Sequence, residues 1–594
     1  MNSKAIRIGH TDGRPVRLSP ERRATHMHVM GASGQGKSKF LEHCIREDIL
    51  AGHGVCLIDP EGDLYESIVD WCASLEVHKT LYRRRIHLFD PSDPNWRFRF
   101  NPLFVHQSEK PRHRVDNVIE ALAQVWGGED SRNTPAIRNT IRAILTVLMA
   151  KGYSLAEAFY LTSTADHDQV VAYLTHDISD PIVAEIWEGY RHMAEQAKRD
   201  HLTEFGGSRR RFAELLGDAE IRETLSAYDA PIDFRECMDN GDIVLINLSP
   251  EAMGDDPARA FGALFVRELF YCASRRDPKT AQQKPFYAYI DECGDFLTAD
   301  ITRILARSRK RGFHVILAHQ WLEQLRERGD AIYQGVMSIQ NKVIFGGISD
   351  EDAVILADQL FRTEYDLEIP VQSLTKPGVV GYRRTWLNNW SESEGASEGY
   401  AESTTVGEAT SDVTGTSQSQ SVTPTYDEFG FPTSQSVITM AAAESAVSAI
   451  NRSVGRSTTY VSVRSASRGQ GASESLEPIL ELLPGAVHGL ENVRHMAVAR
   501  LRDIPPRHAV VKGSATPSFD IETYAITTPV VTDRLVENFT QHVLAASPYT
   551  VPADEARLML QHHQRRLFHD ARTFSGGYAV HPLLDAAEDD DGLG

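Results

Sequence analysis

Eight residues near the start of the chain have the types and spacing of a phosphate-binding loop. Residues 31–38 read GASGQGKS, which fits the pattern G-x4-G-K-S. Glycines in such a loop let successive backbone N–H groups turn toward phosphate oxygens, and the N-terminus of the following helix adds partial positive charge. The lysine meets the β and γ phosphates, and the serine hydroxyl binds Mg2+. The sequence therefore predicts ATP and Mg2+ as cofactors, with these residues at the nucleotide: Gly31, Ala32, Ser33, Gly34, Gln35, Gly36, Lys37, Ser38 and Lys39.

Two carboxylates follow an apolar segment farther along the chain. Residues 286–290 read FYAYI, and Asp291 and Glu292 come directly after them. In ATPases with a phosphate-binding loop, an aspartate at this point holds the Mg2+ shell, and the next residue can polarise the attacking water as a general base. The pair alone is a weak signal, because a solvated strand end has the same composition. Together with the loop, it predicts Asp291 and Ser38 as metal ligands and Glu292 as a catalytic base beside Lys37.

Polar residues after another apolar segment, and a run of basic residues before it, complete the set of candidate catalytic residues. The apolar segment 314–318 is followed by His319 and Gln320. A glutamine there can orient water or report the γ phosphate. Arg309 lies in the run RSRKR at 307–311. A guanidinium delivered to the γ phosphate of a neighbouring subunit would stabilise charge in the transition state. The alternative for this run is an exposed basic helix end.

The elements that must position these residues alternate in an α/β order. Residues 1–104 read as strand, loop, helix and further strands, which predicts a parallel-rich sheet with helices on both faces. Between 105 and 234 amphipathic helical patterns replace the strands, which predicts an inserted all-helical subdomain. Strand patterns return within 235–387. We therefore predict one α/β core composed of 1–104 and 235–387.

The last third of the chain divides into two further parts. Residues 388–475 are rich in Ser, Thr, Gly, Glu and Ala and poor in large apolar residues. The sequence therefore predicts a disordered linker or insertion there. Residues 476–594 form a small C-terminal extension, with strand patterns at 509–512 and 524–526 and a helix at 553–566. We expect the strands of this extension to return to the edge of the core.

Composition limits the remaining function classes. The 594 residues carry a formal net charge of −20. This total gives no support to nonspecific nucleic-acid binding, although basic groups can gather in a ring's channel. The six cysteines form no C-x2-C pair, and they read as small core residues of a reducing cytosol. We see no signal peptide, and the longest apolar stretches are shorter than the roughly 18 residues of a membrane span. The predicted location is cytoplasmic, with recruitment to the inner membrane through a partner as a further option.

The order of motifs resembles a known superfamily. After GASGQGKS come VCLIDPEGDL at 55–64, LFDPSDPNWRFRFNPL at 88–103, YIDECGDF at 289–296 and ARSRKRGFHVILAHQ at 306–320. This succession resembles the HerA/FtsK superfamily of hexameric DNA pumps, and within it the TraD/TraG-like coupling ATPases of conjugative type IV secretion. The resemblance covers roughly residues 1–390. The expected departure from membrane-anchored coupling proteins is that the loop already begins at Gly31 and that no transmembrane helix is predicted before it.

The resemblance implies a RecA-like P-loop core in a homo-hexamer. By that likeness Lys37 and Ser38 contact phosphate and Mg2+, Asp291 and Glu292 contact metal and water, Gln320 is the sensor and Arg309 is the arginine finger. Asp59 and Glu61 fall near the place where the family completes its nucleotide site. The helical insertion resembles the all-α domain that faces cytoplasmic cargo in coupling proteins.

Several functions share this site. The leading hypothesis is an ATP-hydrolysing DNA translocase in conjugative transfer or type IV secretion, with a relaxase or secretion channel as partner. A HerA-type antiviral or DNA-processing ATPase with a nuclease partner is a second hypothesis. A pump for protein cargo fits the acidic charge, and a scaffold that binds ATP without turnover is the fourth option, which the presence of Glu292 disfavours. Whether DNA is single- or double-stranded stays open.

Overall fold

The computed structural model describes most of the chain. The described residues are 5–74, 81, 84–106, 111–126, 135–161, 168–196, 205–361, 375–389, 395–403, 410–413, 422–426, 432–438, 447–450, 457–465, 471–484, 490–513 and 516–574. They divide into two compact units, of which the first comprises 1–364 and 494–594 and the second comprises 365–493. Every candidate site residue lies in the first unit.

A large mixed sheet forms the centre of the first unit. Its strands from β10 to β5 are parallel, and the four strands at the other edge are antiparallel. The predicted α/β class with a RecA-like, parallel-rich core is therefore confirmed. The strands in spatial order are β2 (Arg14–Leu18), β1 (Ile6–Thr11), β20 (Thr516–Glu522), β19 (His508–Gly513), β10 (Lys342–Phe345), β3 (Met27–Met30), β9 (Phe313–His319), β8 (Phe286–Ile290), β4 (Gly54–Asp59), β7 (Ile243–Asn247) and β5 (Ile86–Phe89).

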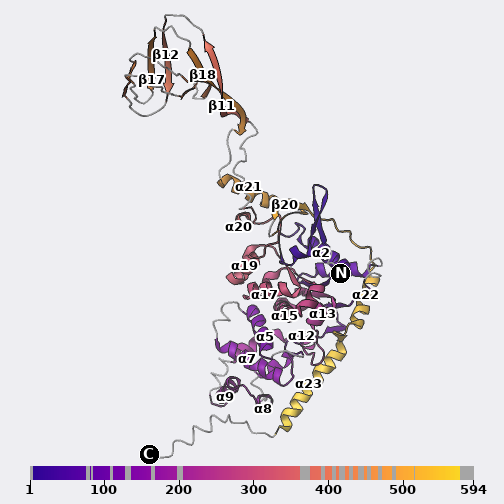
Figure 1. Ribbon diagram of the computed structural model, residues 1–594. Coiled ribbons are helices and arrows are strands. Elements are labelled where there is room, and N and C mark those ends of the chain that lie inside the picture. The colour runs from indigo at the N-terminus through magenta and orange to yellow at the C-terminus, as the bar shows by residue number, and fades with distance from the viewer. Residues whose placement is uncertain are drawn as a thin grey trace, which may run out of the picture. The chain divides into compact units, whose positions relative to one another are not determined.

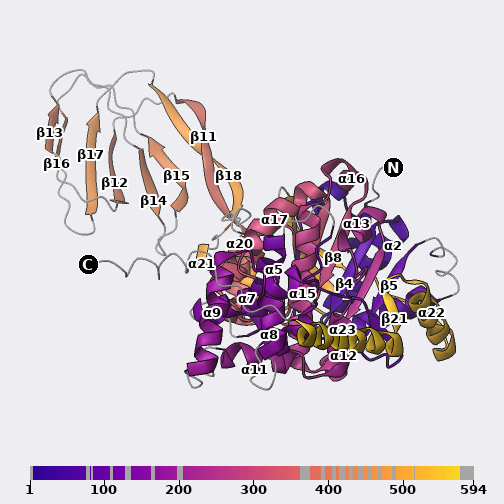
Figure 2. The ribbon, with the colours of Figure 1, turned by 90° about the horizontal axis from the view of Figure 1, so that it is seen from below.

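Helices cover both faces of the parallel strands, which explains why those strands are apolar throughout. In β4, Val55 and Leu57 pack in one hydrophobic cluster, whereas Cys56 and Ile58 pack in the other. Figure 2 shows β4 and β8 between helix α2 and helix α15. One cluster contains residues from α2 (Lys37–Ala51), α3 (Asp63–Ala73) and α22 (Asp533–Ala546), and the other contains residues from α13 (Phe234–Asn240) and α15 (Asp255–Ser274).

The helical part of the first unit lies in sequence between β6 (Trp96–Phe98) and α13. Its apolar side chains join the same cluster as α15, so this part packs on one face of the sheet. The order of elements matches the predicted helical insertion, although its boundaries stay a prediction. The helices are α5 (Pro111–Val125), α7 (Pro135–Ala150), the 3-10 helix η1 (Leu155–Leu161), α8 (Asp168–Thr175), α9 (Pro181–Gln196), α11 (Gly206–Leu215) and α12 (Ala219–Leu225).

Shorter helices join the strands of the core. They are α1 (Pro20–Arg23), α14 (Pro250–Met253), α16 (Pro278–Gln283), η2 (Cys293–Asp295), α17 (Ile301–Ser308), η3 (Arg309–Arg311), α18 (Leu322–Glu327), α19 (Asp330–Met337) and α20 (Asp350–Phe361). No described helix is both long enough and apolar enough to span a bilayer.

The C-terminal residues return to the core in two places. After α21 (Leu490–Arg502), β19 pairs antiparallel with β10 and thereby joins the main sheet, as expected for 509–512. The strand predicted at 524–526 is wrong, because β20 ends at Glu522, after which Thr523 is hydrogen-bonded to Arg507 instead. Farther on, β21 (Thr550–Pro552) pairs with β6, and α23 (Ala553–Thr573) runs beside α12 and α8 (Figure 1).

The second unit contains antiparallel strand pairs. Its longest pair joins β11 to β18, and several shorter strands lie within 388–475, which the sequence predicts as a disordered linker or insertion. Thr, Tyr and Val occur at 458–463, and such residues favour extended backbone. The strands are β11 (Thr375–Asn389), β12 (Gly395–Ser403), β13 (Thr410–Val413), β14 (Val422–Tyr426), β15 (Pro432–Ile438), β16 (Val447–Ile450), β17 (Ser457–Ser465) and β18 (Gly471–Pro484).

Candidate nucleotide-binding site

The phosphate-binding loop joins β3 to α2, as the sequence predicts. Gly34 and Gly36 both have positive φ angles, in the left-handed region that side chains rarely adopt. A Cβ atom at Gly31 would lie 2.4 Å from the Cβ of Phe345, so this position has no room for a side chain. Lys37 is the first residue of α2, and its side chain is buried. The loop therefore presents a helix N-terminus and a lysine at the same point.

The strand order gathers the other candidate residues beside this loop. Strand β9 lies between β3 and β8, and all three are parallel. Their carboxyl ends therefore meet at one edge of the sheet. The loop follows β3, Gln320 follows β9, and Asp291 with Glu292 follows β8.

Glu292 is the centre of the contacts at this edge. Lys37 Nζ is bonded to Glu292 Oε1 and lies 3.3 Å from Asp291 Oδ1. Gln320 Nε2 donates to the same Oε1 at 3.1 Å. Gln324 Nε2 donates to Oε2 at 3.2 Å. The structure thus brings together four predicted residues and adds Gln324, which the sequence analysis missed.

Gln324 is located on the short helix α18, the next element after β9. Its Oε1 accepts the backbone N–H of Gln320 at 3.1 Å, so the same side chain contacts the backbone of Gln320 and the carboxylate of Glu292. The only signal in the sequence is the spacing of the two glutamines, which is too common to indicate a site. Glu292 itself has a positive φ angle, an uncommon backbone conformation that is found at functional sites.

Two buried aspartates give the site an excess of negative charge. Asp59 ends β4, and its carboxylate accepts the backbone N–H groups of Glu61 at 3.1 Å and Tyr65 at 2.8 Å. Burial raises the pKa of Asp59 to about 6, and the charge of Asp291 adds to the rise. Burial also raises the pKa of Asp291, against the lowering effect of Lys37. Burial is the main cause of both rises, and Lys37 is shared between the carboxylates of Asp291 and Glu292.

The pKa of Lys37 also reflects the neighbouring carboxylates. Burial by itself would lower its pKa, but Asp291 and Glu292 together raise it above the ordinary value. Carboxylate and hydroxyl oxygens are ligands that Mg2+ prefers. A buried aspartate with a raised pKa next to the loop that carries Ser38 therefore fits a divalent cation. The pKa of Glu61 is raised as well, first by burial and then by the negative charges of Glu292 and Asp291.

Arg309 and Lys39 lie apart from this cluster. Arg309 is exposed in η3 and precedes the amino end of β9, whereas Gln320 follows the carboxyl end of that strand. Lys39 Nζ is paired with Glu42 at 2.7 Å and is more than half exposed. The roles of both residues stay predictions.

A buried histidine pair joins β3, the strand before the phosphate-binding loop, to β9. His28 Nε2 lies 2.7 Å from His319 Nε2, and the two rings are stacked. His319 Nδ1 lies 3.0 Å from the carbonyl oxygen of Trp321, so Nδ1 carries the proton and Nε2 accepts from His28. Burial lowers the pKa of His319 to about 3, so the ring stays neutral at physiological pH. The pair therefore adds a side-chain contact to the backbone pairing of β3 with β9.

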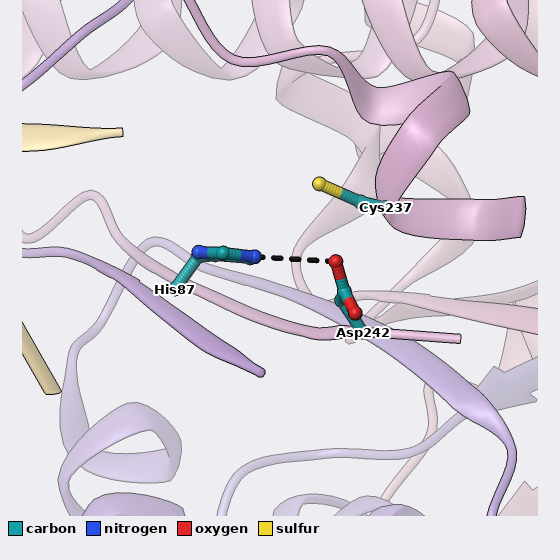
Figure 3. Close-up of side chains that lie close together, drawn as sticks. All are labelled: His87, Cys237 and Asp242. Atoms are coloured by element: carbon teal, nitrogen blue, oxygen red, sulfur yellow. Dashed lines mark hydrogen bonds and ion pairs between the residues drawn. The ribbon is translucent and has the colours of Figure 1, made fainter. Parts of the chain in front are cut away.

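A further group of ionisable and metal-ligating side chains lies away from the phosphate-binding loop, by strands β5 and β7. His87, Cys237 and Asp242 approach one another near the amino ends of the strands (Figure 3). His87 Nε2 is 3.3 Å from Asp242 Oδ2, and His87 Nδ1 is 2.9 Å from Ser547 Oγ, so both ring nitrogens have partners. Cys237 is among six cysteines that are all buried and free of disulfides. We interpret this cluster as a structural link between β5, α13 and the end of α22.

No protein-family model matches this chain, and no curated protein sequence matches it. Among solved structures, it is similar to the bacterial conjugative coupling protein TrwBdeltaN70 in an unbound form, with a TM-score of 0.49, 14% identity and coverage of 89% of this chain and 90% of that one. The plasmid coupling protein TrwB with ADP and Mg2+ gives a TM-score of 0.48 at 14% identity, covering 89% and 91%. VirB4 of Thermoanaerobacter pseudethanolicus gives 0.41 at 13% identity, covering 64% and 94%. Such similarity concerns the course of the backbone and assigns no residue a role.

Proposed function

We propose that the protein is an ATP-hydrolysing motor that moves DNA or nucleoprotein, acting as a coupling ATPase in conjugative transfer or type IV secretion. The observation that carries the proposal is the convergence of Lys37, Gln320 and Gln324 on Glu292 beside the phosphate-binding loop. The order of sequence motifs, which resembles the HerA/FtsK superfamily, supports DNA as the substrate that is moved.

Each residue of the cluster has a distinct part in hydrolysis. The N–H groups of the loop and the α2 N-terminus bind the phosphates, and Lys37 exchanges its carboxylate partner for them. Ser38 and Asp291 would hold Mg2+, which neutralises phosphate charge when bound. Glu292, released by Lys37, accepts a proton from the attacking water as general base. Gln320 and Gln324 fix the orientation of the Glu292 carboxylate.

Arg309 supports a ring in which each subunit completes its neighbour's site. The whole of β9 separates Arg309 from Gln320. At about 3.3 Å per residue, this strand spans roughly 20 Å, so Arg309 is too distant to stabilise the γ phosphate of its own subunit. A neighbouring subunit, with its nucleotide against this edge, would receive the guanidinium. The proposed assembly is a homo-hexamer with Arg309 acting in trans.

A mixing experiment tests the ring. Arg309→Ala should keep nucleotide affinity and lose turnover by about 1,000-fold or more, because an arginine finger acts only on transition-state charge. Lys37→Ala should lose turnover in its own site. Mixed subunits of the two variants should recover part of the activity, since some interfaces then pair an intact Lys37 with an intact Arg309. Mixtures with no more turnover than either variant alone would contradict the trans arrangement.

Whether DNA is the substrate that is moved is tested by the steady-state ATPase rate of the full chain, with the Glu292→Gln variant as the blank. Single- and double-stranded DNA are titrated at two salt concentrations. Stimulation that weakens with salt is expected, because phosphate contacts release counterions. Turnover that is indifferent to both DNAs would favour a protein cargo or a nuclease partner instead. The formal charge of −20 is the observation that keeps the protein cargo as the second candidate.

A further inference from the structure

A segment from the C-terminal part of the chain forms one wall of the phosphate-binding loop. The backbone N–H of Arg507 donates to the carbonyl oxygen of Gln35 at 2.9 Å. A Cβ atom at Gly36 would lie 3.5 Å from both the N and Cα atoms of Arg507, so the two backbones are in contact. This contact joins residues that are far apart in the sequence, and no motif indicates it.

The backbone of Arg507 is fixed on both sides. Its carbonyl oxygen accepts the backbone N–H of Thr523 at 2.8 Å and the Thr523 hydroxyl at 3.0 Å. Its φ angle is positive, in the left-handed region that is uncommon for a residue other than glycine. The following strand, β19, pairs with β10, which itself neighbours the loop strand β3. The Arg507 N–H is therefore held by the main sheet in a defined place.

The side chain of Arg507 has a different environment. Its guanidinium donates to Glu522 at 3.2 Å and to the carbonyl oxygen of Thr523 at 3.3 Å, and the Arg507 and Glu522 side chains are both more than half exposed. Exposed ion pairs of this kind contribute little to stability. The feature of Arg507 that matters at the loop is thus its backbone conformation and not its charge.

The physical role of this contact follows from how such loops bind phosphate. The loop presents its N–H groups inward, so its carbonyl groups must point outward and find other donors. We propose that Arg507 is a positioning residue, whose backbone N–H holds the Gln35 carbonyl outward and thereby preforms the loop for the nucleotide. This proposal rests on the proposed nucleotide binding. It makes the C-terminal segment part of each subunit's ATP site.

Two substitutions at Arg507 separate backbone from side chain. Arg507→Pro removes the N–H and imposes a negative φ angle, whereas Arg507→Gly keeps the N–H and tolerates the positive φ. The readout is the Kd of a fluorescent ATP analogue with Mg2+ for the full chain, together with kcat and KM. We expect Arg507→Pro to weaken binding about tenfold, as the loss of one hydrogen bond and of loop order implies. We expect Arg507→Gly to stay within about twofold of the unmodified chain.

A third variant reaches the same contact without changing Arg507. Gly346 lies against this segment, and a Cβ atom there would be 2.1 Å from the carbonyl oxygen of Ile504. Gly346→Ala should therefore displace residues 504–507 from the loop and weaken nucleotide binding, even if Arg507→Pro fails to fold. Gly513→Ala is the matched control, because its Cβ would meet only side-chain oxygens, those of Thr516 and Asn341, at the far end of β19.

The outcomes distinguish the two proposals. If the unmodified chain binds no ATP analogue, the nucleotide-binding proposal and this inference both fail. If it binds, and Arg507→Gly weakens binding as much as Arg507→Pro does, then the side chain acts and the positioning role is wrong. Binding by folded Arg507→Pro and by Gly346→Ala that equals the unmodified chain would also overturn the inference. A loss in both of these variants, with binding kept in Arg507→Gly and Gly513→Ala, supports it.

Discussion

Two buried charge clusters contact the same strand, β8, and they differ in how their charges balance. In the first, Arg23 donates to both oxygens of Asp48 at 2.6 Å, and the Tyr289 hydroxyl donates to Asp48 at 2.5 Å. Burial by itself would raise the pKa of Asp48, but Arg23 outweighs it and lowers the value to about 2. The Arg23 guanidinium also lies 3.6 Å from the centre of the Tyr287 ring. In this cluster one guanidinium balances one carboxylate.

The second cluster, at the end of the same strand, is unbalanced. Lys37 is shared by Asp291 and Glu292, while Asp59 accepts hydrogen bonds from backbone N–H groups, and the pKa values of both aspartates are raised. Burial costs every carboxylate its hydration, and a guanidinium bonded to both oxygens of Asp48 offsets that cost, whereas one lysine shared by two carboxylates leaves part of it uncompensated. The two clusters therefore differ in how many carboxylates share one cation, and the cluster with more carboxylates than cations lies beside the phosphate-binding loop.

The largest expected effect is a loss of turnover in the second cluster, caused by a substitution that keeps ATP binding. Glu292→Gln keeps the size of the side chain but removes the general base, so kcat should fall about 100- to 10,000-fold while ATP stays bound. Steady-state turnover and the Kd for ATP are the two measurements.

Glu323→Gln, on the exposed side of α18, is the matched control for this change. It alters the same functional group near the site without touching Lys37, and kcat should stay close to that of the unmodified chain. Equal turnover by the two variants would remove Glu292 from the mechanism.

The next effect lies in the first cluster and concerns stability alone. Arg23→Ala leaves the Asp48 charge buried without its guanidinium, with Tyr289 and His53 as hydrogen-bond partners, so the free energy of unfolding should fall by about 3–5 kcal/mol. Lys37→Met removes the cation of the other cluster and should cost less, because carboxylates whose pKa is already raised can take up protons. Urea unfolding of both variants checks the difference. A larger loss in Lys37→Met would invert the comparison.

Local sequence patterns were sufficient to predict most of the second cluster. An apolar run followed by polar residues marks where a buried strand ends, and parallel strands bring such ends together. This logic predicted that Lys37, Asp291, Glu292 and Gln320 meet, although it did not predict that Lys37 bonds to Glu292.

Other parts of the site could not be predicted for a physical reason. The contact of Arg507 with the loop uses a backbone N–H, which every residue except proline carries, so no residue type marks it. Gln324 belongs to a helix too short to show a period. The cluster of Arg23 and Asp48 is equally invisible, because the pairing depends on how α1 and α2 pack and not on spacing within either helix.

The smallest expected effects are changes in the free energy of unfolding when Asp59 and Asp48 are each replaced by asparagine. The two changes should have opposite signs at pH 7. Between pH 3.8 and about 6 the folded protein binds more protons at Asp59 than the unfolded chain does, so stability falls as pH rises through this window. Asp59→Asn removes that penalty, and at pH 7 it should raise the free energy of unfolding by about 1–3 kcal/mol, at roughly 1.4 kcal/mol per pKa unit.

Asp48 has the opposite sign. Its pKa is lowered to about 2, so its contribution to stability is present above its unfolded value of 3.8 and is lost as pH falls toward 2. Asp48→Asn should therefore destabilise at pH 7 and have little effect near pH 2. Unfolding curves at both pH values, without Mg2+ or nucleotide, give the comparison. Because Mg2+ offsets the excess charge that destabilises the free protein, its addition should shrink the gain in Asp59→Asn and leave Asp48→Asn unchanged. A loss of stability in Asp59→Asn at pH 7 would mean that its backbone hydrogen bonds outweigh its charge, and the contrast between the clusters would fail.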